Sequence, residues 1–214
     1  MRLNAAIRLG IDAWSQPERS LRILVVFAHP LETSFVSALH ARVVEMLRAG
    51  GHIVDDLDLY AEKFDPVMSR EGLLRYVDTN ANTREVEAYV QRLRAAEALV
   101  LVFPVWFDGL PAIMQGYFQR VFLPGVSVRI DEAGLFHPNL RNIKRMAAVC
   151  AYGESRRDVA AKNDPPRRFV RENIRALIDP QGRFEYLALY DMNFTAAPRR
   201  AAFMKRVTRA FEAW

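Results

Sequence analysis

The fold of this chain is decided by residues 98–123, which read ALVLVFPVWFDGLPAIMQGYFQRVFL. The segment begins with a run of Val and Leu up to Phe103, which is typical of a strand buried on both faces. Pro104 ends the run, because proline has no N–H to donate to a neighbouring strand. Apolar residues then recur at helical spacing from Pro111, which suits the first turn of a helix. The stretch therefore predicts a buried strand that turns directly into a helix.

Two aromatic residues, Trp106 and Phe107, follow the end of this strand, and Gly109 comes shortly after them. They either fill a gap beneath a loop or form a flat platform for a ligand. The second interpretation fits the carboxyl edge of an α/β sheet, where such folds bind their ligands. This segment alone leaves both interpretations open.

The rest of the chain alternates strands and helices. Further strands are predicted at residues 21–28, 53–60, 143–151 and 184–190, and further helices at 33–49, 84–97, from Pro165 onward and at 198–214. Residues 61–82 are expected to form an excursion or lid, and residues 124–142 a loop. This alternation predicts an α/β fold with a five-stranded parallel sheet in the flavodoxin-like order 2-1-3-4-5, and helices on both of its faces.

Length and composition bound the organisation of the chain. With 214 residues, of which 51% are hydrophobic, we expect one domain over residues 21–214 after an N-terminal extension of residues 1–20. No apolar run is long enough to cross a bilayer, and the extension lacks the features of a secretory signal. The single cysteine, Cys150, fits a reducing compartment. These features predict a cytoplasmic location without an integral membrane segment.

The net charge of +5 comes with basic residues concentrated in the second half of the chain. No nucleic-acid recognition motif accompanies this charge, so we expect no nucleic acid as a partner. A positive field of this size also attracts anionic ligands such as nucleotide phosphates. We expect no metal site.

Two other strand ends carry candidate site residues. After the first strand, His29, Thr33 and Ser34 come where a helix begins, so their polar groups and the free N–H groups of that helix could hold a phosphate. The same hydroxyls also serve as ordinary helix caps. After the fourth strand, Tyr152 offers a hydroxyl or an aromatic face. Gly153 permits a positive φ and a close approach to a ligand, although a simple turn explains it equally well.

The three loops together indicate more than any one of them does. One supplies a seat for a phosphate, one an aromatic pair and one a glycine turn beside a tyrosine. A planar cofactor with a phosphate tail would use all three. The pattern therefore favours a flavin nucleotide.

These residues resemble the flavodoxin-like NAD(P)H:quinone oxidoreductase family, which includes DT-diaphorase and bacterial quinone reductases. The similarity rests on AHP at residues 28–30 with TSF at 33–35, on FPVWF at 103–107 and on GYFQRVF at 116–122. The YG pair at 152–153 resembles the glycine turn of the family. The resemblance covers roughly residues 21–155.

The resemblance implies the following cofactor contacts. The flavin phosphate would meet His29, Thr33, Ser34 and Phe35, and its ring system would be lined by Pro104, Val105, Trp106 and Phe107. Tyr152 and Gly153 would close the other edge near the reactive ring and act as the catalytic residues. The His-Pro and Thr-Ser-Phe motifs favour FAD by resemblance, with FMN as the alternative.

The resemblance also implies an activity. Hydride would pass from NAD(P)H to flavin N5 and then to a quinone or similar acceptor in a ping-pong cycle, with the flavin performing the chemistry. Members of the family are homodimers, and residues 61–82 together with the aromatic residues Tyr117 and Phe118 are expected to supply the contact.

Some positions depart from the family pattern. Val36 stands where many members have asparagine, and Ala151 and Tyr152 replace the threonine pair of the mammalian branch. The catalytic Tyr and His arrangement of that branch is not evident, which leaves the proton donor open. A backbone N–H, such as that of Gly153, could stabilise negative charge near flavin N1 and O2. If it does, replacing Tyr152 with Phe leaves turnover largely intact.

Other function classes fit less well. A flavodoxin-type electron carrier would be acidic and would have a Thr- and Gly-rich phosphate loop. A receiver domain would need acidic residues where His29 stands. The motifs of a flavin-free dinucleotide dehydrogenase and of a serine hydrolase are absent. A regulatory subunit that binds flavin without turnover stays open as an alternative, as does the carrier.

Overall fold

A computed structural model describes residues 20–214 and places five parallel strands in one sheet, in the order β2-β1-β3-β6-β7. The strands are β1 (Arg22–Phe27), β2 (Ile53–Asp58), β3 (Ala98–Val105), β6 (Arg145–Tyr152) and β7 (Arg183–Leu189). This is the predicted flavodoxin-like order, with the fourth and fifth strands labelled β6 and β7. The predicted extension, apart from Ser20, lies outside the described residues.

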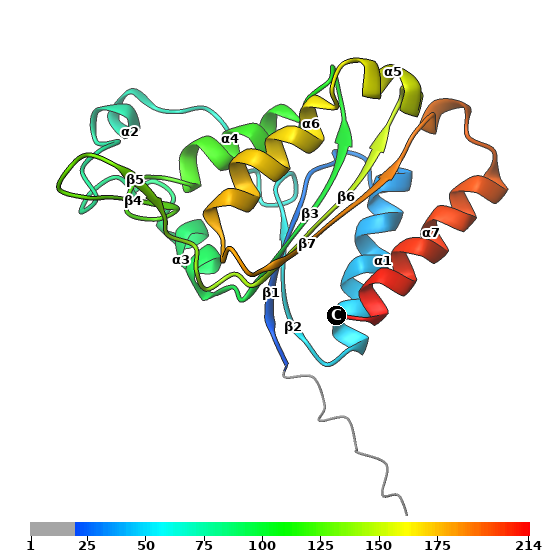
Figure 1. Cartoon of the computed structure of the whole chain (residues 1–214), viewed down its shortest axis with the longest axis horizontal. Helices are drawn as coiled ribbons and strands as arrows, with labels where there is room; N and C mark the ends of the chain where they lie inside the picture. Colours follow the sequence, from blue (N-terminus) through cyan, green and yellow to red (C-terminus); the bar gives the residue numbers. More distant parts are fainter. Residues whose placement is uncertain (1–19) are drawn as a thin grey trace, which may run out of the picture.

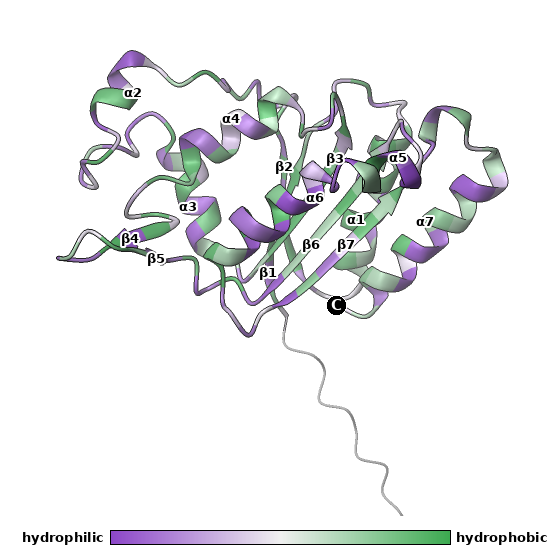
Figure 2. Cartoon of the chain, turned by 45° about the horizontal axis from the view of Figure 1, so that its top comes forward, coloured by the Kyte–Doolittle hydropathy of each residue, from purple (hydrophilic) through white to green (hydrophobic). Residues whose placement is uncertain are grey.

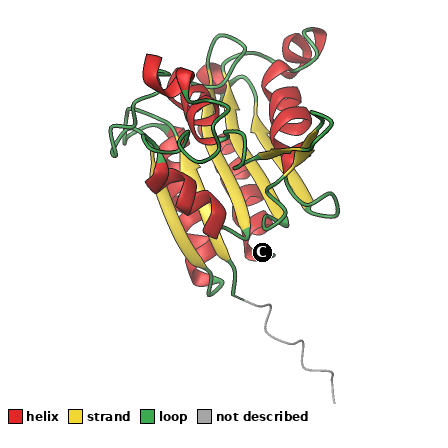
Figure 3. Ribbon diagram, turned by 90° about the vertical axis from the view of Figure 1, so that its left-hand side faces the viewer, coloured by secondary structure: helices red, strands yellow, loops and turns green. Residues whose placement is uncertain are grey.

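Helices cover both faces of this sheet, as Figures 1 and 3 show. One face carries α1 (Phe35–Ala49) and α7 (Ala197–Glu212), and the other carries α3 (Glu87–Ala95), α4 (Ala112–Val121) and α6 (Pro165–Arg168). The short helix α5 (Arg156–Ala161) follows the carboxyl end of β6, and α2 (Arg70–Leu74) lies within the predicted excursion. The layered arrangement brings all loops that follow the strands to one edge of the sheet.

Strand β3 is buried from Ala98 to Pro104, as its apolar sequence predicts. Its side chains alternate between the two faces, so that Val100 and Val102 join the core beneath α1 and α7, while Leu101 and Phe103 join the core beneath α4. Figure 2 shows mainly hydrophobic residues along the central strands, whereas the helices carry hydrophobic and hydrophilic residues in alternation. Burial on both faces explains why this strand carries no polar residue.

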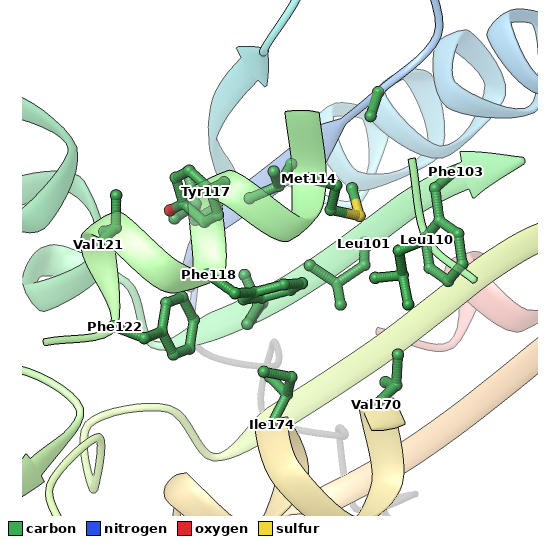
Figure 4. Close-up of a cluster of buried hydrophobic side chains, with 14 of the residues drawn as sticks. Leu101, Phe103, Leu110, Met114, Tyr117, Phe118, Val121, Phe122, Val170 and Ile174 are labelled. Atoms are coloured by element: carbon green, nitrogen blue, oxygen red, sulfur yellow. The ribbon is translucent and has the colours of Figure 1, made fainter. Parts of the chain in front are cut away.

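Helix α4 presents its apolar side to that second core (Figure 4). Tyr117 is fully buried and Phe118 is 5% exposed, and both rings pack edge-to-face against neighbouring aromatic rings. The expectation that these two residues supply a contact between subunits is therefore wrong. Helical spacing identified the buried face correctly, but spacing alone does not tell a core contact from an intersubunit one.

The excursion over residues 61–82 is held against α4. A Cβ atom at Gly116 would lie 2.3 Å from the Pro66 backbone, so glycine is what allows this close approach. Arg120, one helical turn later, is buried and forms ion pairs with Asp65 at 3.1 Å and with Glu85 at 2.8 Å. The excursion is thus anchored at its base by backbone contact and by charge.

Two other segments differ from their predicted form. The predicted loop contains a hairpin of β4 (Val128–Ile130) and β5 (Phe136–Pro138), closed where Asp131 accepts the N–H of Leu135. The helix predicted from Pro165 continues beyond α6 as a π-helix, η1 (Phe169–Ile174), and a 3₁₀ turn, η2 (Arg175–Leu177). Strands of three residues carry too few alternating positions to be recognised, and a change of helical pitch leaves no periodic signal.

The carboxyl terminus of the chain is part of the core. Trp214 is 5% exposed and stacks on Phe211 with ring centroids 5.0 Å apart. The Arg145 guanidinium lies 4.6 Å from the centre of the Trp214 ring, and its Nη2 donates to the Ala213 carbonyl at 2.6 Å. The last residues therefore tie the end of α7 to the beginning of β6.

Candidate flavin site

A cavity of about 260 Å³ lies at the carboxyl edge of the sheet, beyond β1, β3 and β6. It is lined by His29, Ser34, Phe35, Val36, Pro104, Val105, Trp106, Ala151, Gly153, Met192 and Asn193. These residues come from the three predicted loops and from a fourth, the 3₁₀ turn η3 (Met192–Phe194) after β7. The cavity thus occupies the position where open α/β sheets bind their ligands.

The first loop supplies hydrogen-bond donors. His29 Nδ1 accepts the Leu31 N–H at 3.0 Å, which leaves the proton of the neutral imidazole on Nε2. Partial burial lowers the pKa of His29 below its usual value of 6.5, so the ring is neutral at pH 7. Its Nε2–H is therefore a donor that an anionic oxygen can accept.

The start of α1 supplies further donors. Ser34 caps the helix by accepting the Ser37 N–H at 3.0 Å, so the capping interpretation of this residue is correct. Within residues 20–214 the structure gives no acceptor to the N–H groups of Phe35 and Val36, both of which line the cavity. Free N–H groups at the positive end of a 15-residue helix suit a phosphate group.

The second loop supplies an aromatic wall. The Trp106 ring is 42% exposed and meets the His29 ring edge-on, with centroids 5.6 Å apart. Trp106 and Gly109 exchange two backbone hydrogen bonds across a tight turn, at 3.1 and 3.0 Å. The two residues inside this turn, Phe107 and Asp108, have φ of 50° and 55°. A left-handed conformation is unfavourable for a bulky side chain such as Phe107, so the turn stores strain beside the cavity.

The third loop is packed closely against η3. A Cβ atom on Gly153 would lie 3.2 Å from Asn193 Nδ2, so the absence of a side chain allows this approach. Gly153 does not have a positive φ, and that part of the expectation is wrong. Lys162 joins the second and third loops, because its Nζ donates to Asp108 and Glu154, both at 2.8 Å.

Tyr152 lies on the opposite face of the sheet from the cavity. Its hydroxyl donates to Asp164 Oδ1 at 2.6 Å and shares a hydrogen bond of 2.7 Å with the Tyr186 hydroxyl. Its ring stacks on Tyr190, and burial raises the pKa of Tyr152 above its usual value. The structure therefore does not bring this side chain to the residues that line the cavity.

The cavity includes seven of the residues predicted for the site, which are His29, Ser34, Phe35, Pro104, Val105, Trp106 and Gly153. Thr33 and Phe107 are exposed and do not line it. Four lining residues were not predicted, namely Val36, Ala151, Met192 and Asn193. Ala151 could have been found from strand alternation, because it pairs with Pro104 and shares its face.

A metal ion has no evident site in the described part of the chain. No group of three or more His, Cys, Asp or Glu side chains is placed to hold one there. Among residues 20–214 no helix is both long and apolar enough to cross a membrane.

The comparisons with known proteins agree with this geometry. A family described as having a flavodoxin-like fold matches residues 21–209. The chain belongs to this family. Its sequence is 33% identical over 121 residues to NAD(P)H dehydrogenase (quinone) 1 of Cavia porcellus, a match spanning 49% of this chain and 44% of the relative. It is also 33% identical over 113 residues to an NAD(P)H oxidoreductase of Haemophilus influenzae, spanning 50% of this chain and 54% of the relative.

The chain thus spans about half the length of these curated relatives, and the resemblance indicated by the motifs is confirmed at that level. Solved structures show the same fold. An NAD(P)H:quinone oxidoreductase from Methanothermobacter marburgensis has a TM-score of 0.77 at 22% identity, covering 91% of this chain and 98% of the other. An FMN-dependent NADH-azoreductase from Bacillus anthracis, in complex with FMN, has a TM-score of 0.72 at 14% identity, covering 90% and 98%.

Proposed function

We propose that this protein is a flavin-dependent NAD(P)H oxidoreductase that passes hydride to a quinone or a similar acceptor. The observation that carries the proposal is the cavity at the switch point of the sheet. Free helix N–H groups, the neutral His29 donor and the flat Trp106 ring all line it. Similarity to quinone dehydrogenases and to an FMN-bound azoreductase fold supports the same assignment.

The lining residues suit a flavin nucleotide in their chemistry. The N–H groups of Phe35 and Val36 and His29 Nε2 would hold the phosphate, and Pro104, Val105 and Trp106 would hold the ring system. The flavin, when bound, supplies the capacity to accept and donate hydride. FAD is favoured over FMN by the His-Pro and Thr-Ser-Phe motifs, as in the family that the sequence resembles.

His29 is the only titratable side chain among the residues that line the cavity. We therefore propose that backbone N–H groups stabilise negative charge on the flavin ring, and the Gly153 N–H is the candidate. Within the described chain this N–H has no acceptor. A fixed backbone donor aimed at a developing negative charge needs no proton transfer of its own and costs no reorganisation.

A homodimer is part of the proposal. The cavity is slightly smaller than the roughly 300–1,000 Å³ of typical ligand sites, so a second subunit would complete it. The excursion exposes Val67, Leu73, Leu74 and Val77, which are candidates for that contact. A cytoplasmic location stays a prediction from the sequence.

The protein as purified gives the decisive test. We expect a yellow protein whose flavin absorbance bleaches on anaerobic addition of NADH or NADPH and recovers on addition of a quinone. Mass spectrometry of the released cofactor identifies FAD or FMN. A yellow protein that neither nicotinamide reduces would contradict the proposal and favour an electron carrier or a regulatory subunit. A colourless protein that binds neither FAD nor FMN on titration would show that the cavity is not a flavin site.

A further inference from the structure

A second cavity, of about 410 Å³, lies beyond the carboxyl end of β7, outside the candidate flavin site. It lies where the edge strand meets α7 on one face of the sheet and α5 and α6 on the other (Figure 1). It is lined by Arg156, Arg167, Ala188, Leu189, Tyr190, Arg199, Ala202, Phe203 and Arg206. We call it the arginine cavity. It shares no residue with the flavin cavity.

Four arginines from three helices line this cavity, and no carboxylate does. Two of them have acidic partners nearby, because Arg167 lies 3.2 Å from Asp164 and Arg199 lies 3.4 Å from Asp191. Arg156 and Arg206 form no ion pair with any residue that the structure describes. The cavity therefore holds more positive charge than its neighbours neutralise.

Two of the guanidinium groups are held in place by aromatic rings. The Arg167 guanidinium lies 4.6 Å from the centre of the Tyr186 ring, and the Arg206 guanidinium lies 5.4 Å from that of Phe203. Stacking of this kind restricts a long side chain before any ligand binds. Less conformational entropy is therefore lost on binding. These arginines are consequently better prepared to bind an anion than mobile surface lysines would be.

The remaining lining residues add an apolar surface. Ala188, Leu189, Ala202 and Phe203 contribute apolar lining, and the Tyr190 hydroxyl lies at 3.4 Å from both Arg167 Nη2 and Asp164 Oδ2. Inorganic phosphate would leave this surface unused. A ligand with an apolar or aromatic portion would cover it and gain from burial.

Arginines on a protein surface often contact only water. Arg157 on α5 and Arg209 on α7 are exposed residues of this kind. The arginine cavity differs because its four arginines line one concave space. Like charges around one space repel one another, and a bound anion relieves this repulsion. Guanidinium groups also match phosphate oxygens in bidentate geometry.

We propose that the arginine cavity binds an organic phosphate with at least two negative charges and an apolar or aromatic portion, of about the size of a mononucleotide. A volume of about 410 Å³ suits a ligand of that size. The site is distinct from the flavin cavity. The two lie next to each other, because Tyr190 and Met192, on either side of Asp191, belong to different cavities.

Isothermal titration of the purified protein with ADP tests the proposal, with adenosine and inorganic pyrophosphate as comparison ligands. We expect ADP to bind with an affinity that falls as salt is added, adenosine not to bind, and pyrophosphate to bind more weakly than ADP. Equal affinity for pyrophosphate and ADP would overturn the organic part of the proposal, and no binding of ADP would overturn it whole.

Charge-reversal variants locate the site. Arg156→Glu and Arg206→Glu are expected to weaken ADP binding about tenfold or more each, as the loss of a charge-assisted hydrogen bond does. Arg157→Glu and Arg209→Glu change the net charge equally on the same two helices, and are expected to bind ADP within about twofold of the unmodified protein. An equal loss of ADP affinity in all four variants would mean that ADP responds to the overall positive charge of the protein and not to a specific site.

The flavin content of each variant separates this proposal from the proposed function. We expect Arg206→Glu to retain its flavin and its reduction by NAD(P)H. If this variant loses flavin together with ADP binding, or if ADP displaces flavin, the arginine cavity is part of the flavin site and the proposal fails.

Discussion

Phe107 is the most exposed of the large hydrophobic residues in the described chain, and its left-handed φ of 50° is unfavourable for its side chain. Nothing in the fold requires an aromatic ring there. A residue that costs stability and contacts no core is typical of a position selected for a ligand or a partner.

Replacing Phe107 with Asn, which tolerates a left-handed backbone, is expected to raise the free energy of unfolding by about 1 kcal/mol. The same change is expected to weaken flavin binding, since it removes aromatic surface beside the cavity. Urea denaturation and flavin fluorescence measure the two effects. Phe194→Asn is the matched control, because Phe194 is also highly exposed but has no left-handed φ. Lower stability of Phe107→Asn would contradict the argument from strain.

Tyr152 illustrates what the sequence could not decide. A tyrosine before a glycine turn suggested a residue at the cofactor, but strand alternation directs its side chain to Asp164 and Tyr186 on the other face. Without a known strand register, the sequence does not say which of two adjacent residues faces a ligand.

Tyr152→Phe is therefore expected to lower the free energy of unfolding by about 1–3 kcal/mol, because the partly buried Asp164 carboxylate loses the hydrogen bond that the Tyr152 hydroxyl donates. Turnover at saturating substrate is expected to stay within about threefold. Tyr76→Phe serves as control, since the Tyr76 hydroxyl makes no hydrogen bond among residues 20–214. A loss of turnover by several hundredfold without loss of stability would instead assign the Tyr152 hydroxyl to the reaction.

His29 gives a prediction in pH. Because its pKa in the folded protein is lowered from 6.5, its contribution to stability is fully present above pH 6.5 and declines as the pH falls toward the lowered value. A bound phosphate favours the protonated ring and so raises the pKa of His29, and flavin binding is therefore expected to take up protons just above the lowered pKa of the free protein. The pH dependence of the flavin Kd measures this uptake.

His29→Gln is expected to remove that pH dependence and to weaken flavin binding about tenfold. His137→Gln is the control, because His137 bonds Asp131 in the hairpin, away from the cavity. An unchanged pH profile in His29→Gln would assign the proton uptake to another group.

At the scale of elements, the strands and long helices were predictable because each repeats one simple period over enough residues. The short hairpin, the π-helix η1 and the turn η3 were not, since they depend on where neighbouring segments lie. The same holds for the anchoring of the excursion on α4, which joins residues that are 50 positions apart, Pro66 and Gly116.

Gly116→Ala tests that anchoring. The added methyl group would overlap the Pro66 backbone, so we expect a loss of about 1–3 kcal/mol in the free energy of unfolding in spite of the better helix propensity of alanine. Chemical denaturation gives the value. Gln119→Ala, at an exposed position of the same helix, is expected to be neutral. Equal stability of both variants would show that the excursion moves aside without cost.

At the scale of the whole molecule, two hydrophobic cores lie on opposite faces of one sheet and share its five strands. We propose that residues 21–214 unfold as one cooperative domain, because neither core survives without the strands that both use. Calorimetry is expected to give equal calorimetric and van't Hoff enthalpies. Two resolved transitions would contradict this prediction.

The two cavities mark the limit of prediction at this scale. Most of the residues predicted for a flavin site line one cavity, because a parallel sheet places the ends of its strands at one edge whatever the details. The arginine cavity was not predicted, since Arg156, Arg167 and Arg206 come together only through the relative placement of three helices. The sequence showed the charge but not its convergence.

The seat of Trp214 has a practical consequence for following the unfolding of this protein. Its buried ring lies between Phe211 and the Arg145 guanidinium. The emission of an indole ring shifts to longer wavelength when the ring becomes exposed to water. The fluorescence of this tryptophan therefore reports the moment at which α7 detaches from the sheet.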